Sequence, residues 1–209
     1  MSPWLIFGAG GSGVGALMLA HALNERRPVY AVIRKPDVAE RLTQQGVTVF
    51  TGDACNTELV TLACEAAGAN ATILSSIGGT QEYLAHRTVI DAAEKAGLSR
   101  MILVTSLGCG NSWRWLSPRA RTAFGQSVRE KSLAESWLQT STLDYAILRP
   151  GGLLTGDATG NAQRFQNREV HGFVMRADVA AHAAELANTS ELHQQIYSLV
   201  DPELKPARA

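Results

Sequence analysis

Residues 4–15 read WLIFGAGGSGVG, and this stretch decides the fold. The apolar run Trp4–Phe7 predicts a short buried strand, and the glycines after it have the spacing G-x-G-x-x-G. A helical pattern then continues over residues 13–24. Strand, glycine turn and helix in this order are typical of a βα unit that binds phosphate, because the helix N-terminus offers free N–H groups at the turn.

The rest of the chain alternates between short apolar runs and helical patterns. Further strands are predicted at residues 29–34, 47–50, 71–76, 101–106, 144–148 and 196–200. Helices are predicted at residues 58–67, 83–96, 126–138 and 178–187. The apolar runs are continuous, which suits strands that are covered on both faces of a parallel sheet. We therefore expect residues 1–209 to form one α/β domain with a doubly wound (Rossmann) parallel sheet.

Two stretches, at about residues 107–125 and 151–176, look irregular and are longer than ordinary connections. Long loops inside a compact domain are usually functional. Both stretches follow the carboxyl ends of predicted strands, where ligands of open α/β sheets bind. We expect these two loops to build a small substrate region.

The charge balance is neutral, with 19 Lys plus Arg against 19 Asp plus Glu, so no basic field favours nucleic acid or an anionic membrane. No apolar run approaches the roughly 20 residues of a membrane-spanning helix, and strand-like sequence from Trp4 onward leaves no room for a signal peptide. The spacing of the three cysteines and five histidines predicts neither a disulfide framework nor a metal site. The sequence favours a cytoplasmic monomer or homodimer.

The glycine turn is predicted to hold the pyrophosphate of a nicotinamide dinucleotide. A missing Cβ lets the backbone approach the phosphates, and the helix N-terminus supplies N–H donors. The candidate residues are Gly8, Gly10, Gly11, Ser12 and Gly13. Gly15 offers an alternative register, and a turn used only for close packing is the competing interpretation.

An NAD site usually has an acidic residue after the second strand, which accepts a hydrogen bond from the ribose 2′-hydroxyl. This chain has Arg34 and Lys35 there, which suit a 2′-phosphate, so NADP(H) is favoured over NAD(H). The competing interpretation is that these two side chains are only solvated charges at a strand end. Asp53, followed by Ala54, could accept a hydrogen bond from adenine or cap the next helix. After the fourth strand, the backbone must pass close to the cofactor. The candidate cofactor-binding residues there are Ser75, Ser76 and Ile77.

Further motifs accompany the glycine turn and Arg34 across nearly the whole chain. They are Gly52-Asp53, Val104-Thr105-Ser106, Lys131, LRPGG at residues 148–152 and RADVA at residues 176–180. With these motifs the sequence resembles the atypical short-chain dehydrogenases/reductases. More narrowly, it resembles the NAD(P)H-binding group that contains biliverdin-IXβ/flavin reductase and the nitrogen-metabolite-repression regulators.

In catalytic members of that superfamily, a serine works with a tyrosine four residues before a lysine. Ser106 matches the serine and Lys131 the lysine, but Ser127 stands at the tyrosine position. A serine hydroxyl is a poor general acid, which puts ordinary alcohol–carbonyl interconversion in doubt. The resemblance implies that Lys131 donates to the nicotinamide ribose. It also places Thr105 near the cofactor. By the same resemblance, Pro150, Gly151 and Gly152 would present backbone groups to the nicotinamide carboxamide.

Aromatic and basic residues gather in the first irregular stretch. The candidate substrate contacts are Trp113, Trp115, Arg119 and Phe124. Tryptophan faces stack on flat conjugated ligands and arginines pair with acidic groups, which suits a flavin, a quinone or a linear tetrapyrrole. Alternatively, the tryptophans pack the loop onto the domain or form a dimer contact. His171 lies in the second stretch, where a surface role is favoured for it.

The sequence favours an NADPH-dependent reductase that passes a hydride to a planar conjugated small molecule. Ser106 would hydrogen-bond the acceptor, and the last proton would come from solvent. The alternative is a non-catalytic NAD(P)-binding sensor or regulatory protein, in which Ser127 reflects lost chemistry. An epimerase or dehydratase acting on a nucleotide sugar is disfavoured by the missing tyrosine and the short C-terminal part.

Overall fold

The computed structural model describes residues 1–205, and its main sheet has eight strands. These are β1 (Trp4–Phe7), β2 (Val29–Ile33), β3 (Thr48–Thr51), β4 (Thr72–Ser75), β5 (Arg100–Val104), β6 (Asp144–Pro150), β8 (Gln163–Phe165) and β10 (Gln195–Val200). Their order is β3-β2-β1-β4-β5-β6-β10-β8, and every neighbouring pair is parallel except β10 with β8. The chain moves outward from β1 to β3 and returns to β4 on the other side. The predicted doubly wound α/β fold is therefore confirmed.

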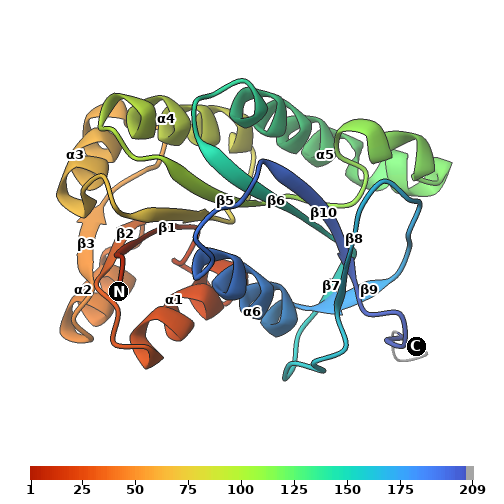
Figure 1. Ribbon diagram of the computed structural model, residues 1–209, viewed down its shortest axis with the longest axis horizontal. Helices are drawn as coiled ribbons and strands as arrows, with labels where there is room; N and C mark the ends of the chain where they lie inside the picture. The colour runs from red at the N-terminus through yellow and green to blue at the C-terminus, as the bar shows by residue number, and fades with distance from the viewer. Residues whose placement is uncertain (206–209) are drawn as a thin grey trace.

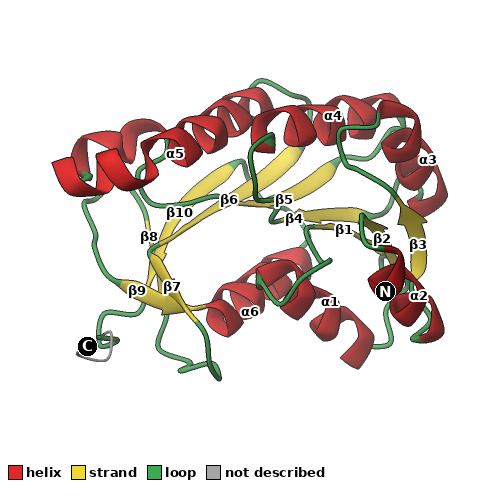
Figure 2. Cartoon of the chain, turned by 180° about the vertical axis from the view of Figure 1, so that it is seen from behind, coloured by secondary structure: helices red, strands yellow, loops and turns green. Residues whose placement is uncertain are grey.

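Helices cover both faces of the sheet, as Figure 1 and Figure 2 show. One layer contains α1 (Val14–Asn24), α2 (Pro36–Gln44) and α6 (Arg176–Ala187). The other contains α3 (Thr57–Ala67), α4 (Glu82–Lys95) and α5 (Pro118–Gln139). Each face has its own core: Ile6 of β1 packs in one, and Leu5 and Phe7 pack in the other. A continuous apolar run was the right signal because β1 is buried on both sides.

Close approach of the backbone fixes the turn after β1. Gly8 has φ +89°, and a Cβ there would lie 2.7 Å from the carbonyl oxygen of Ser76. A Cβ at Gly15 would lie 2.5 Å from the carbonyl oxygen of Gly8. Only glycine lets α1 begin directly against the ends of β1 and β4. The crevice at this point, where the strand order changes direction, is the expected ligand position in such sheets.

The first irregular stretch is more ordered than the sequence predicted. A short 3-10 helix spans Gly110–Trp115, and α5 begins at Pro118, eight residues before the predicted start at residue 126. The Ser117 hydroxyl caps this helix by accepting from the amide N–H of Ala120 at 3.2 Å. Serine followed by proline is a helix-start signal, so the sequence already indicated that α5 begins at Pro118. The exposed first turns of α5 lack an apolar stripe, which explains the error.

The second stretch also contains strands that the sequence did not predict. β7 (Gly152–Leu154) and β9 (Phe173–Met175) form a two-stranded parallel sheet, and β8 pairs with the edge of the main sheet. Strands of three residues are too short to show a period in the sequence. Helix α2 was missed as well, because it buries only Ala39 and Leu42.

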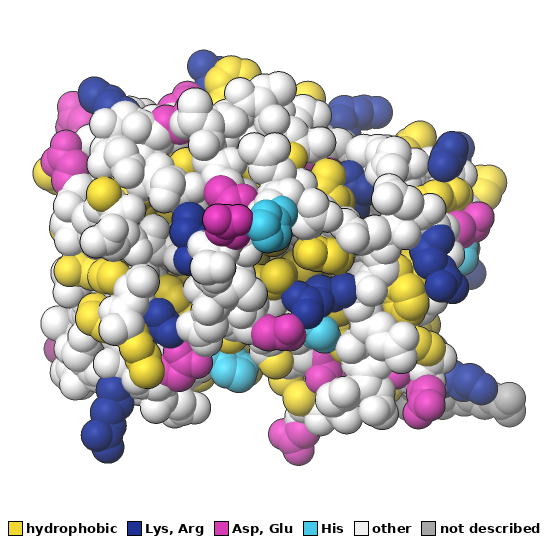
Figure 3. Space-filling view, viewed as in Figure 1, with side chains coloured by type: hydrophobic (Ala, Val, Ile, Leu, Met, Phe, Trp, Pro, Cys, Tyr) yellow, Lys and Arg dark blue, Asp and Glu magenta, His cyan; other side chains and the backbone are white. Residues whose placement is uncertain are grey.

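The surface view in Figure 3 shows acidic and basic side chains interspersed among apolar ones on the visible face. This distribution agrees with the neutral charge balance of the sequence. Within residues 1–205, no helix is both long enough and apolar enough to cross a membrane.

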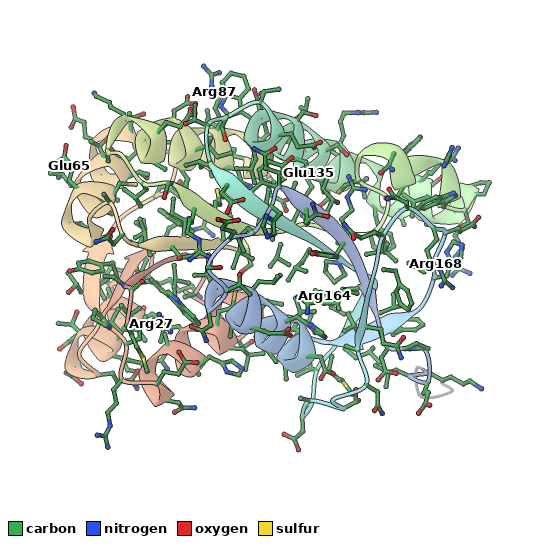
Figure 4. The ribbon with its side chains drawn as sticks, viewed as in Figure 1. Arg27, Glu65, Arg87, Glu135, Arg164 and Arg168 are labelled. Carbon is green, nitrogen blue, oxygen red and sulfur yellow. The ribbon has the colours of Figure 1, made fainter. Side chains whose placement is uncertain are left out.

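A buried ion pair joins α5 to β6. Glu135 of α5 accepts from Arg149 of β6 twice, at 2.9 Å from Nε and 2.6 Å from Nη2. The Thr105 hydroxyl donates to Glu135 Oε1 at 2.6 Å, and Arg149 Nη1 donates to Asn111 Oδ1 at 2.6 Å. Figure 4 labels Glu135 where α5 faces β6. The network ties the carboxyl ends of β5 and β6 to α5, and it thereby holds the segment that carries Ser106.

Replacing Glu135 by glutamine keeps the side-chain shape but leaves the Arg149 guanidinium buried without a counter-charge. We expect Glu135→Gln to lower the free energy of unfolding by about 3 kcal/mol, because removing one partner of a buried pair is strongly destabilising. Urea unfolding followed by circular dichroism measures the change. The control is Glu65→Gln at an exposed position of α3, which should stay within about 0.5 kcal/mol of wild type. Equal effects of the two substitutions would contradict this role for the ion pair.

Candidate cofactor and acceptor site

A cavity of about 330 Å³ opens over the carboxyl ends of β1, β2, β3 and β4; we call it the glycine-turn cavity. Its lining combines the glycine turn with the ends of the neighbouring strands. The residues are Phe7, Gly8, Gly10, Gly11, Val32, Arg34, Lys35, Gly52, Asp53, Ala54, Cys55, Ser76, Ile77, Gly78, Gly79, Thr80, Gln81 and Ala85. Tertiary structure thus brings together most of the predicted cofactor residues from four separate strand ends.

The turn itself has the features that a pyrophosphate requires. Within the described residues, the amide N–H groups of residues 10–13 donate to no protein acceptor. A Cβ at Gly11 or Gly13 would meet nothing within 4 Å, so the space beside the turn is open. Gly15 lies behind the turn, against Gly8, and does not line the cavity. The free donors and the open space fit an anionic ligand at residues 10–13, with Gly15 serving close packing.

Arg34 and Asp53 follow the carboxyl ends of the neighbouring strands β2 and β3. The Arg34 side chain is 73% exposed and reaches Asp53 Oδ2 at 3.8 Å. The Cys55 amide donates to Asp53 Oδ1 at 2.8 Å, and this hydrogen bond, helped by Arg34, lowers the pKa of Asp53. Asn56, whose Oδ1 accepts from the Leu59 amide at 3.0 Å, caps α3 instead. The helix-cap role considered for Asp53 is therefore wrong, and its carboxylate stays available at the cavity.

Of the three cofactor residues predicted at the end of β4, two line the glycine-turn cavity and one does not. Ser76 and Ile77 line the glycine-turn cavity, whereas Ser75 is the last, buried residue of β4 and does not. The Ser76 hydroxyl is buried and has no hydrogen-bond partner within the described residues. An unpartnered buried hydroxyl beside the glycine turn is consistent with a polar ligand in this cavity.

A second ion pair joins the middle of α5 to the start of α4. The Lys131 ammonium contacts the Glu82 carboxylate and donates to the Ser127 hydroxyl at 3.0 Å. The other oxygen of Glu82 accepts from the Gly79 amide at 2.9 Å, which ties the pair to the cavity wall. Burial lowers the pKa of His86 to about 4, so its ring is neutral near Lys131. An ammonium has three donors, and two of them are used here.

A larger cavity, of about 490 Å³, lies over β5 and β6; we call it the loop cavity. Its lining is largely apolar and contains no Asp or Glu. The residues are Thr105, Ser106, Leu107, Gly108, Ser112, Trp115, Leu116, Ala120, Phe124, Lys131, Pro150, Gly151, Gly152, Leu153, Val170, His171, Gly172 and Arg176. Both irregular stretches of the sequence contribute to it, together with Ser106 and Lys131, two of the three predicted catalytic residues.

Ser106 is held at the floor of the loop cavity. Its hydroxyl donates to the Leu107 carbonyl at 3.0 Å, and its carbonyl accepts from the Cys109 amide at 3.2 Å. Thr105 lines the same cavity, but its hydroxyl is committed to Glu135. Ser127 contacts Lys131 without lining either cavity. The serine at the position of the usual tyrosine therefore lies behind the lysine.

The Pro150-Gly151-Gly152 segment offers fewer polar groups than predicted. The amides of Gly151 and Gly152 already donate to the carbonyls of Leu199 at 2.9 Å and Gly172 at 3.0 Å. Proline has no N–H, and its carbonyl accepts from the Leu107 amide at 2.9 Å. Gly152 is itself part of the parallel β7–β9 ladder, so within the described residues the Gly151 carbonyl is the backbone group of this segment that remains for a ligand. The expectation that this segment presents backbone groups thus narrows to one acceptor.

The substrate candidates separate in the structure. Trp115 and Phe124 line the loop cavity, and the Phe124 side chain is 64% exposed. Trp113 instead packs against Arg121, whose guanidinium carbon lies 5.2 Å from the centroid of the Trp113 ring. Arg119 is exposed and lies outside the cavity. The loop-packing alternative thus describes Trp113. Sequence reasoning missed Arg176, although it begins the RADVA motif that was singled out. Within residues 1–205, no group of three or more metal-ligating side chains occurs.

Comparison with known proteins agrees with this geometry. Residues 8–190 match a family model described as NAD(P)H-binding. The chain is 71% identical to ChuY, an anaerobillin reductase from Escherichia coli O157:H7, with a TM-score of 0.97 over 98% of this chain and 100% of that one. It is 67% identical to ChuY from E. coli CFT073, with a TM-score of 0.92 over 99% and 100% of the two chains.

More distant relatives include sanguinarine reductase from Eschscholzia californica. It is 27% identical over 124 residues, which are 56% of this chain and 44% of that protein. The chain spans less than two thirds of the length of the curated relatives that it matches. The family model covers most of the sequence, including the glycine turn, both ion pairs and the RADVA motif. The chain belongs to the NAD(P)H-binding family, in the atypical short-chain dehydrogenase/reductase group that its motifs resemble.

Proposed function

We propose that this protein is an NADPH-dependent reductase whose acceptor is a linear tetrapyrrole. The observation that carries the proposal is the loop cavity: apolar, partly aromatic, and open beside Ser106 and Lys131. Such a cavity suits a flat conjugated body better than a small polar sugar or alcohol. The proposal is supported by the 71% identity to a protein described as an anaerobillin reductase.

The cofactor would lie across the carboxyl ends of the central strands. The free amides of residues 10–13 would bind the pyrophosphate, with the adenosine end toward Arg34 and Asp53. Arg34 is exposed at the cavity and suits a 2′-phosphate, so NADPH is the preferred form. The remaining donor of Lys131 would bind the nicotinamide ribose, at the boundary with the loop cavity.

When bound, NADPH supplies the hydride. The protein then has to orient the acceptor and exclude water from the reacting face. Trp115 and Phe124 would stack on the acceptor, and the Ser106 hydroxyl would turn from the Leu107 carbonyl to hydrogen-bond the polar edge of the acceptor. Ser127 lines neither cavity, so the proton would come from solvent rather than from this side chain. A conjugated acceptor delocalises the added charge, which removes the need for a strong general acid.

The test is NADPH oxidation, followed by absorbance, with biliverdin, FMN, riboflavin and a quinone as acceptors. Turnover with the tetrapyrrole well above that with the other three is expected. A non-catalytic sensor is the second candidate, favoured by Ser127 at the tyrosine position. Tight NADPH binding without turnover across the panel would establish the sensor and reject the reductase.

Ser106→Ala removes the only side-chain hydroxyl assigned to the acceptor. We expect kcat/KM for the tetrapyrrole to fall about tenfold, with NADPH affinity unchanged, because one hydrogen bond to developing charge is lost. Steady-state kinetics with a separate cofactor titration measures both. The control, Ser136→Ala, changes an exposed serine of α5 and should leave both quantities as in wild type. An unchanged kcat/KM in Ser106→Ala would remove Ser106 from the mechanism.

Arg34→Ala tests the cofactor preference. The Kd for NADPH should rise about tenfold or more, while the Kd for NADH should hardly change, because only NADPH carries the 2′-phosphate. Fluorescence titration of the reduced cofactors gives both constants. Arg41→Ala, at an exposed arginine of α2, is the matched control. Equal weakening of both cofactors, or tighter wild-type binding of NADH, would contradict the role given to Arg34.

A further inference from the structure

Arg176, the first residue of α6, lines the loop cavity and is half-buried. Its Nη1 donates to the Thr155 hydroxyl at 2.7 Å and makes a longer contact to the Leu153 carbonyl at 3.4 Å. These contacts hold one edge of the guanidinium against β7. Within the described residues, Nε and Nη2 make no hydrogen bond. An arginine fixed on one edge keeps its other donors oriented for a planar anion.

The charges around the loop cavity single out this residue. Among the described residues, no Asp or Glu lines the cavity, and three lining residues have basic side chains: Lys131, His171 and Arg176. Lys131 is paired with Glu82, and His171 contacts Glu169 at 2.7 Å. Within residues 1–205, no carboxylate pairs with Arg176. Arg176 is therefore the cavity cation whose charge is left for a ligand.

The neighbours of Arg176 define what kind of ligand this is. Leu153, Val170, Trp115 and Phe124 form apolar lining in the same cavity. A simple inorganic anion would leave that apolar surface unused. A ligand with a flat apolar body and an acidic side chain would use both parts, because its ring system packs on the apolar lining while its acid meets the guanidinium.

We propose that Arg176 binds a carboxylate side chain of the acceptor and so selects acidic tetrapyrroles over their neutral esters. This inference rests on the proposed function and names the group that the same site recognises. Arg176 is a specificity-determining residue that orients the acceptor, with its acid at the β7–α6 side and its conjugated body directed toward Ser106.

The experiment measures binding and turnover separately. Biliverdin and its dimethyl ester, which differ only in the two acids, are titrated into the NADP⁺-saturated protein, with tryptophan fluorescence as readout. Wild type, Arg176→Gln, Arg176→Lys and the control Arg129→Gln are compared; Arg129 is exposed on α5 and outside both cavities. NADPH oxidation by wild type with biliverdin is measured in parallel.

We expect Arg176→Gln to weaken binding of the diacid about tenfold and binding of the ester by less than about twofold. Arg176→Lys should fall between, because it keeps the charge without the fork, and Arg129→Gln should match wild type. Equal losses for both ligands, no loss, no preference of wild type for the diacid, or no binding of either ligand would overturn the assignment.

The two proposals can fail independently. Binding that depends on Arg176, without any NADPH oxidation, would uphold the carboxylate site and reject the reductase. Turnover with binding that ignores Arg176 would do the opposite.

Discussion

The contact between Gly15 and the carbonyl of Gly8 is the constraint on which the site depends. Because neither residue has a side chain, α1 begins directly against the end of β1, and the amides of residues 10–13 stay unpaired within the described residues. β1 lies between β2 and β4, where the strand order changes direction, so these donors face the crevice. The same close approach places Ser76 beside the turn.

Two ion pairs connect α5 to the elements around that crevice. Lys131 and Glu82 join α5 to the start of α4, and Glu135 and Arg149 join it to β6. A buried charge is tolerable only when it is paired, so each pair fixes one backbone position relative to another. Together they hold the floor of the loop cavity in place. They also neutralise the charges of Lys131 and Arg149, whereas Arg176 has no carboxylate partner within the described residues.

Ser127, which stands at the position of the usual tyrosine, lies outside both cavities. Ser127 donates nothing to either cavity and instead accepts a hydrogen bond from Lys131. The site is therefore organised for orientation more than for proton transfer. This arrangement is the reason for proposing an acceptor that carries its own conjugation, for which stacking and one oriented hydroxyl would be sufficient.

The sequence by itself determined the doubly wound fold, the glycine turn and the position of Ser127 four residues before Lys131 on one helix, because strand–helix alternation and i, i+4 spacing are local properties. It missed α2, β7, β8 and β9, which are too short or too exposed to leave a periodic pattern. Only tertiary structure decided that Trp115 lines the loop cavity while Trp113 does not, and that Arg176 joins it from a distant motif. Which side chains meet across strand ends depends on long-range packing, and no local pattern encodes it.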